Sequence, residues 1–140
     1  MSWKKALMDL RDKMKPNDIR GALTTKEVGQ SMELVAAEYL KQQGLTLIAT
    51  NFSCRFGEID LILQEQQILV FVEVKYRQSA AFGGAINAIS PTKREKIIKT
   101  AQIYMQQAKL NEYNTCCRFD VVAIQGTASH PDISWLKNAF

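Results

Sequence analysis

Histidine and cysteine are scarce in this chain, which holds one histidine, His130, and three cysteines. Neither Cys54 nor the adjacent pair Cys116 and Cys117 has the spacing of zinc ligands. A single histidine, beside Pro131 in a polar stretch, argues against a histidine-centred nuclease and against a Ser-His-Asp hydrolase. The cysteines form no obvious disulfide framework, which fits a reducing compartment. We therefore expect a cytoplasmic protein.

Long apolar runs are also missing, since no segment approaches the roughly 20 apolar residues that a membrane span requires. The first residues lack the hydrophobic core of a secretory signal. With 140 residues, of which 46% are hydrophobic, the chain is long enough for one core and short for two domains. These features predict one globular domain without a membrane span.

A strongly basic face is not evident either. The net charge is +4, and most of the excess lies in residues 1–20, which leaves the rest of the chain close to neutral. The residues responsible are Lys4, Lys5, Arg11, Lys13, Lys15 and Arg20, set against Asp9, Asp12 and Asp18. A broad nucleic-acid-binding face over the whole domain is therefore not expected.

One local concentration of positive charge remains, at residues 93–99. Lys93, Lys96 and Lys99 recur at helical spacing, with Ile97 and Ile98 predicted to face inward. Such a helix start could hold nucleic-acid phosphates through its side chains and its backbone donors. The alternative is a solvated helix face, and the pattern does not decide between them.

Three charged residues, Asp60, Glu73 and Lys75, sit inside apolar, strand-like sequence. The two segments read Gly-Glu-Ile-Asp-Leu-Ile at 57–62 and Ile-Leu-Val-Phe-Val-Glu-Val-Lys at 68–75. Burying a charge without a partner is expensive, so these residues need an explanation. The simplest is a divalent metal ion held by the carboxylates, with an ammonium group beside it.

The spacing of these residues predicts a hairpin with a defined register. If its loop is 66–67, antiparallel pairing sets Asp60 opposite Glu73, with β-carbons roughly 5 Å apart. Lys75 then shares a face with Glu73, because side chains on a strand alternate. A slip of one residue would move Asp60 to the other face and break the site.

The residue types determine the chemistry that the hairpin could perform. Two carboxylates and several waters suit Mg²⁺ or Mn²⁺. Such an ion lowers the pKa of a bound water and stabilises negative charge on a phosphate. Lys75 could orient the attacking water or offset charge in the transition state. The alternative is a salt bridge from Lys75 to Asp60 or Glu73, but the two adjacent carboxylate strands favour the metal site.

The rest of the chain predicts an α/β fold in the order α-β-β-β-α-β-β. A helix is expected over 24–43 with Gly44 as its stop, followed by a strand over 45–51 and then by the two charged strands. Ser90 and Pro91 are typical of a helix start, and this helix should run to about residue 108. A buried strand over 118–124, a loop over 125–131 and a short edge strand over 133–136 complete the domain.

The first residues form a separate predicted unit, a basic amphipathic arm and linker over 1–23, ahead of the domain at 24–140. Trp3, Leu7, Leu10 and Met14 make one apolar stripe on a short helix that Pro16 would end. The stripe fits docking onto the parent domain or onto a second copy, which would give a homodimer. Contact with nucleic acid or a membrane surface is the alternative.

Taken together, the charged segments resemble the PD-(D/E)xK nuclease signature. More closely, the chain resembles the uncharacterised YraN-type family of small bacterial proteins, itself similar to archaeal Holliday-junction resolvases. The resemblance covers nearly the whole domain, with Glu-Leu-Val-Ala-Ala-Glu-Tyr-Leu at 33–40, the two charged strands, and Arg-Phe-Asp-Val-Val-Ala at 118–123. It implies a restriction-endonuclease-like core, in which a central mixed sheet is flanked by helices.

The resemblance also implies roles for individual residues. Asp60 and Glu73 would be metal ligands, the Val74 carbonyl a further ligand, Lys75 the catalytic lysine, and Glu33 a helical carboxylate that binds metal directly or through water. Glu58 is typical of the family, and either a salt bridge or a supporting role at the site fits it. Contacts to nucleic acid are expected from Lys93, Arg94, Lys96 and Arg77.

Two departures from the family pattern bear on the phosphate contact. Met32 stands where a glycine is common, and Ser53 stands where an arginine is common. Neither removes a predicted ligand, but an arginine beside the site is missing.

The predicted function is a Mg²⁺-dependent endonuclease, with Mn²⁺ as a substitute, that hydrolyses DNA phosphodiester bonds, by analogy in branched or recombining DNA. No small-molecule cofactor is expected. The alternative is a catalytically silent module that keeps the fold and binds nucleic acid or recruits a partner.

Overall fold

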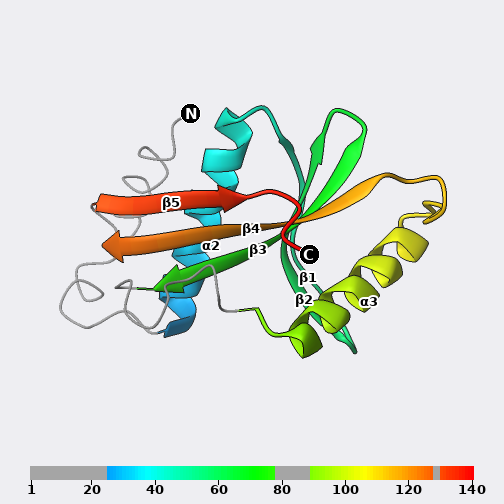
Figure 1. Ribbon diagram of the computed structural model, residues 1–140, viewed down its shortest axis with the longest axis horizontal. Coiled ribbons are helices and arrows are strands. Elements are labelled where there is room, and N and C mark those ends of the chain that lie inside the picture. The colour runs from blue at the N-terminus through cyan, green and yellow to red at the C-terminus, as the bar shows by residue number, and fades with distance from the viewer. Residues whose placement is uncertain (1–24, 78–88, 128–129) are drawn as a thin grey trace.

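The computed structural model describes residues 25–77, 89–127 and 130–140 (Figure 1). The predicted order α-β-β-β-α-β-β is confirmed. The elements are α2 (Thr25–Gln42), β1 (Thr46–Cys54), β2 (Gly57–Glu65), β3 (Ile68–Arg77), α3 (Pro91–Gln107), β4 (Cys117–Thr127) and β5 (His130–Leu136). The arm predicted over 1–23 lies outside the described residues. No helix in the described ranges is long and apolar enough to cross a membrane.

The five strands form one mixed sheet in the order β1-β2-β3-β4-β5. Only β3 and β4 run parallel, and the other neighbouring strands are antiparallel. Parallel neighbours cannot be joined by a tight turn, and α3 lies in the connection between β3 and β4. The prediction of an α/β fold with a mixed sheet flanked by helices is therefore confirmed.

The two helices cover opposite faces of this sheet, and α2 passes behind the strands in Figure 1. Residues of β2 and β3 supply both cores, and they alternate between the two from Leu61 to Leu63 and from Leu69 to Val72, as the period of a strand requires. The core under α2 contains Met32, Val35, Ala36, Leu40, Leu61, Leu63, Val70 and Val72, among others. The core under α3 contains Ile59, Ile62, Leu69, Phe71, Ile97, Ala101 and Met105.

The predicted helix ends are close to the observed ones. Gly44 adopts a left-handed φ of 99° just past the end of α2, a conformation that a glycine adopts without steric cost. The Ser90 hydroxyl caps α3 by accepting a hydrogen bond from the Lys93 N–H at 3.2 Å. The expectation that Ile97 faces inward is confirmed, whereas the same expectation for Ile98 is wrong, because its side chain is 37% exposed.

The loop predicted over 125–131 is also wrong. Strand β4 continues to Thr127, and β5 begins at His130, with Gly126 paired to Pro131. Glycine and proline suggested a loop, yet a proline is tolerated in an edge strand such as β5, because only one side of that strand pairs with a neighbour. Because β4 lies between β3 and β5, its apolar run is buried as expected.

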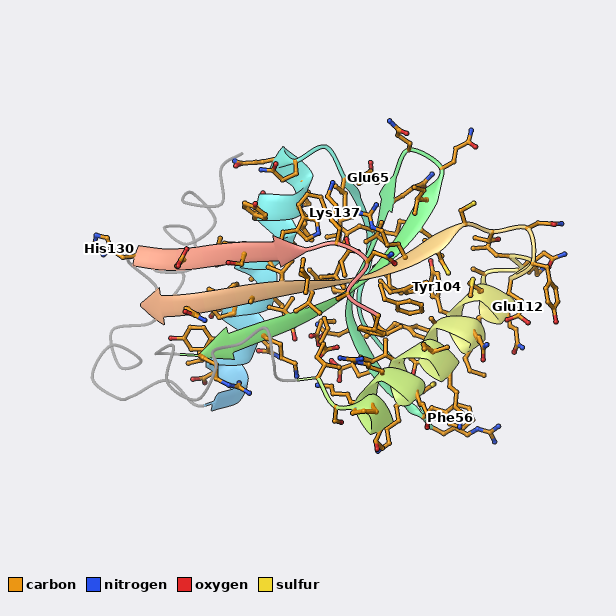
Figure 2. The ribbon with its side chains drawn as sticks, viewed as in Figure 1. Phe56, Glu65, Tyr104, Glu112, His130 and Lys137 are labelled. Atoms are coloured by element: carbon orange, nitrogen blue, oxygen red, sulfur yellow. The ribbon has the colours of Figure 1, made fainter. Side chains whose placement is uncertain are left out.

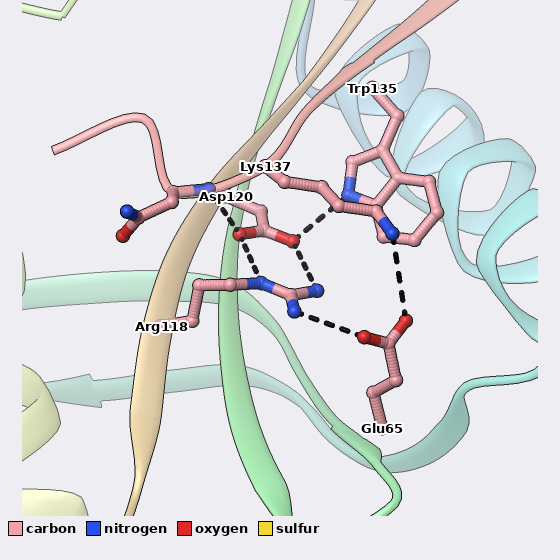
Figure 3. Close-up of polar contacts among 6 residues, drawn as sticks. Glu65, Arg118, Asp120, Trp135 and Lys137 are labelled. Atoms are coloured by element: carbon pink, nitrogen blue, oxygen red, sulfur yellow. Dashed lines mark hydrogen bonds and ion pairs between the residues drawn. The ribbon is translucent and has the colours of Figure 1, made fainter.

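Asp120 on β4 lies at the centre of a buried polar network that joins three strands of the sheet (Figure 3). Its carboxylate accepts hydrogen bonds from the Arg118 Nε at 2.9 Å and Nη2 at 3.0 Å, from the Trp135 indole at 2.9 Å, and from the Asn138 N–H at 2.9 Å. The remaining Nη1 of Arg118 donates to Glu65 at 3.0 Å. A fully buried carboxylate with four donors is well satisfied, so this network ties β2, β4 and β5 together.

We expect Asp120→Asn to lower the free energy of unfolding by about 3 kcal/mol or more, since an amide cannot accept all four hydrogen bonds and the mostly buried Arg118 keeps only Glu65 as a charged partner. Glu65→Gln is the matched control, because Glu65 bonds to the same guanidinium but is 25% exposed. It should cost about 1 kcal/mol or less. Urea denaturation measures both. Equal losses would show that burial does not decide the strength of this network.

Candidate metal centre

The candidate site lies where β2 and β3 separate. The two strands pair in the predicted register from Glu65↔Ile68 to Leu61↔Val72. Within the described residues, Leu61↔Val72 is the last pair before the strands separate. Asp60, the next residue on β2, lies in the resulting gap, and its Oδ2 accepts a hydrogen bond from the Val74 N–H at 2.8 Å. Since the N–H and C=O of one strand residue point to the same edge, we expect the Val74 carbonyl to face this gap too.

Strand β1 bends beside the same gap. Its ladder with β2 passes from Thr50↔Leu61 to Phe52↔Ile59, and Asn51 between them has a left-handed φ of 52°. Apart from glycine, asparagine is one of the few residues that adopt this conformation readily. The Asn51 side chain hydrogen-bonds to Glu33 of α2. The bend therefore helps to hold a helical carboxylate at the opening of the sheet.

Three carboxylates converge at this opening: Glu33 from α2, and Glu58 and Asp60 from β2. One oxygen from each lies within 4.8 Å of the others. Hard carboxylate oxygens gathered this closely fit the ligand preference of Mg²⁺ or Mn²⁺. The sequence left the role of Glu58 open, and its place in this group was not predicted. Its separation from Asp60 by a single residue was the available signal.

Glu73 lies beside this group but is held by two lysines. Its carboxylate, 7% exposed, contacts the Lys93 Nζ at 2.9 Å and the Lys75 Nζ at 3.7 Å. The expectation that Glu73 and Lys75 share a face therefore agrees with the contacts. The salt bridge between Lys75 and Glu73, which was the alternative to the metal site, is present as well. Lys93 lies closer to the Glu73 carboxylate than Lys75 does.

Burial, reinforced by neighbouring negative charge, raises the pKa of two of these carboxyl groups. Burial, and then the charge of Glu73, raise the pKa of Asp60 to about 8, although the hydrogen bond from Val74 opposes the shift. Burial likewise raises the pKa of Glu33, with the charge of Glu58 adding to it and the hydrogen bond to Asn51 opposing it. A bound cation would relieve these shifts, because it favours the charged carboxylates.

The lysines are shifted in opposite directions. Burial, and then contact with Lys93, lower the pKa of Lys75 below the ordinary lysine value, in spite of the charge of Glu73. Burial would also lower the pKa of Lys93, but its contacts with Lys75 and Glu73 outweigh burial and raise it. Lys93 therefore holds its proton more tightly than an ordinary lysine, whereas Lys75 gives up its proton more easily than a lysine in water.

The structure brings Glu33, Asp60, Glu73, Val74 and Lys75 together. The residues predicted to contact nucleic acid are more scattered. Lys93 lies in the site, as described above. Lys96 is exposed on α3, Arg94 lies 5.8 Å from the centroid of the Phe140 ring, and the exposed Arg77 donates to the Tyr76 carbonyl at 2.8 Å.

Comparison with known proteins gives the family. The uncharacterised protein family UPF0102 matches residues 32–124. A UPF0102 protein of Colwellia psychrerythraea is 51% identical over 117 residues, covering 84% of this chain and 91% of that protein. A UPF0102 protein of Vibrio vulnificus is 44% identical over 119 residues, covering 85% and 96%. A UPF0102 protein of Nitrosococcus oceani is 43% identical over 117 residues, covering 84% and 94%. The chain belongs to the UPF0102 family.

The raised pKa of Asp60 makes the stability of the metal-free protein depend on pH. An aspartate in an unfolded chain has a pKa of about 3.9. Above that pH the unfolded chain loses a proton that Asp60 in the folded protein keeps until about pH 8. The contribution of Asp60 to the free energy of unfolding is therefore fully present at low pH and is lost as the pH rises towards 8. Asp60→Asn keeps the acceptor for Val74 without a titrating group. In EDTA it should raise the Tm by on the order of 5 °C at pH 8.5, and by little at pH 4.5.

Thermal melts across this pH range measure the effect, with Asp132→Asn as the control at an exposed carboxylate of β5. Mg²⁺ should stabilise the wild type at pH 8.5 and leave Asp60→Asn unchanged. If Asp60→Asn raised the Tm equally at both pH values, the raised pKa of Asp60 would be contradicted.

Proposed function

We propose that this UPF0102 protein is a divalent-metal-dependent endonuclease that hydrolyses phosphodiester bonds of DNA. The observation that carries the proposal is the meeting of Glu33, Glu58, Asp60 and Glu73 with Lys75 where β2 and β3 separate. A partly buried carboxylate whose pKa is raised to about 8 is costly to keep for packing alone. Perturbed groups of this kind, gathered beside a strand opening, are typical of reaction centres.

Within this proposal, Mg²⁺ or Mn²⁺ would be held by Glu33, Glu58 and Asp60, with Glu73 and the Val74 carbonyl next to them. Such an ion supplies a water of lowered pKa and offsets negative charge on the phosphate. Glu73 could join the ligands through its Oε2, because its contacts with Lys93 and Lys75 both use Oε1. Lys93 could then stay paired with Glu73 beside the cation.

Lys75 is the residue proposed to position the attacking water. Its side chain is 13% exposed, and its Nζ lies 3.7 Å from Glu73. An ammonium with a lowered pKa can donate a hydrogen bond to the water or the phosphate and gives up its proton more easily than an ordinary lysine. Because Lys75 lies on the rigid interior strand β3, its position is fixed by the sheet rather than by a loop.

The choice of branched or recombining DNA rests on the resemblance to Holliday-junction resolvases, a fold-level analogy. A cutter of a symmetric junction would need two copies with their sites on related strands. The homodimer, the separate arm over 1–23, the cytoplasmic location and the absence of a small-molecule cofactor stay predictions.

A second function is supported by the ion pair between Lys93 and Glu73. A carboxylate already neutralised by lysine does not need a metal ion, so the fold could persist as a silent module that binds nucleic acid or recruits a partner. This alternative predicts DNA affinity without cleavage under any metal condition.

Cleavage assays separate the two functions. We expect the wild type to cut single-stranded, duplex or four-way-junction DNA with Mg²⁺ or Mn²⁺. Asp60→Asn and Lys75→Ala should each lower the rate by about 100-fold or more, because each removes a group used at the reacting phosphate. Gel electrophoresis of end-labelled DNA measures the rates.

Lys41→Ala is the matched control, since it removes a lysine that pairs with Glu38 on the surface of α2. Its rate should equal that of the wild type. Equal cutting by all four proteins would indicate a contaminant and reject the nuclease. Undiminished DNA binding with no cutting by any of them would favour the silent module.

A further inference from the structure

A row of lysines on α3 leads away from the candidate metal centre. Lys93 contacts Glu73 at 2.9 Å, within the site. One turn further along α3, the Lys96 Cβ lies 3.8 Å from where a Cβ on Gly57 would stand. At the next turn, the Lys99 Nζ lies 5.7 Å from the centroid of the Phe56 ring. The row thus runs from the carboxylates to the turn between β1 and β2.

That turn carries an arginine and an aromatic ring side by side. The Arg55 guanidinium lies 4.7 Å from the centroid of the partly exposed Phe56 ring. Both Arg55 and Lys99 are therefore within cation–π distance of one ring. Figure 2 places Phe56 beside α3 at the end of this hairpin.

The turn is held against α3 by local hydrogen bonds. The Phe56 N–H donates to the Cys54 Sγ at 3.4 Å, and that thiol donates to the Thr100 hydroxyl at 3.6 Å. Thr100 is fully buried and donates in turn to the Lys96 carbonyl at 2.7 Å. The arginine and the ring are thus presented on a fixed support, which lowers the entropy lost when a ligand binds.

The positive charge of this surface is available to a partner. Arg55, Lys96 and Lys99 are exposed, and within the described residues none of them has an ion pair within 4.0 Å. Residues 93–99 contain a single acid, Glu95. A domain that is near neutral overall has therefore gathered cations along one line that starts at its carboxylate site.

We propose that Arg55, Phe56, Lys96 and Lys99, here called the α3–turn surface, bind the DNA strand on one side of the bond to be cut. The cations would contact successive phosphates, and the Phe56 ring would stack on an unpaired base. From Lys93 to Lys99 the helix rises about 9 Å. Phosphates of one strand follow each other every ~3.4 Å along a duplex, so the row spans two to three of them.

This inference rests on the proposed function, because it takes the carboxylate site as the place of cutting. Nucleic acid is favoured over an anionic membrane because the row begins at a site suited to phosphate chemistry and offers one aromatic ring.

The test measures DNA affinity in EDTA, by fluorescence anisotropy, for a single-stranded and a duplex oligonucleotide over 50–200 mM NaCl. Arg55→Gln/Lys99→Gln should weaken binding about 10-fold or more and lower the slope of log K against log salt by about 1.4–1.8, the loss of two phosphate contacts. Phe56→Leu should weaken single-strand binding about 5-fold or more and duplex binding less.

Lys41→Gln/Lys109→Gln is the matched control, since it also removes two positive charges, at an exposed position of α2 and just past the end of α3. It should bind within about twofold of the wild type. Thermal melts confirm that every variant is folded, and the single variant Lys99→Gln replaces the pair if the double variant is not. Equal loss in both double variants would mean that only total charge matters and would overturn the proposal.

Two further outcomes keep this inference separate from the proposed function. If the wild type cuts DNA but the α3–turn variants bind and cut as the wild type does, the inference falls and the nuclease stands. If no protein cuts but only these variants lose DNA binding, the nuclease falls and the surface remains a DNA contact. A last measurement tests binding of the wild type to vesicles of phosphatidylcholine and phosphatidylserine. If the protein bound these vesicles as tightly as DNA, the proposal that nucleic acid is the partner would be overturned.

Discussion

The crowding of carboxylates at the opening between β2 and β3 is the constraint on which the site depends. Charges of one sign repel most strongly where water is partly excluded, and here they come from two strands and a helix. The chain offsets part of this cost with its own cations, Lys75 and Lys93, and with the backbone N–H of Val74. We propose that a site balanced in this way can take up a metal ion without refolding.

The helices and the buried network give that opening its position. Capping by Ser90 sets the first turn of α3, and this turn carries Lys93 to Glu73. Asp120, which pairs with Val72 next to the gap, joins β4 to β5 and to the residues after it through four hydrogen bonds that its carboxylate accepts. This network fixes β4 and β5 on one side of β3, whereas β2 and β3 separate on the other side.

Much of the fold and part of the site could be predicted from the sequence. Alternation of apolar residues and a polar loop at 66–67 determined the hairpin register, because a slip would bury charges in the core. The contact of Lys93 with Glu73 could not be predicted, since it depends on how α3 packs across the sheet. Asp120 was open to the same reasoning as Asp60, a charge within an apolar strand, but its partners Trp135 and Asn138 come from tertiary structure. The extension of β4 and β5 was missed because Gly126 and Pro131 imitate a loop.

The most direct measurement is an anomalous difference map from crystals of the wild-type protein soaked in MnCl₂. We expect a manganese peak within direct bonding distance of the Asp60 carboxylate and within reach of Glu33 and Glu58. The absence of a peak at saturating manganese would contradict a metal site at this opening.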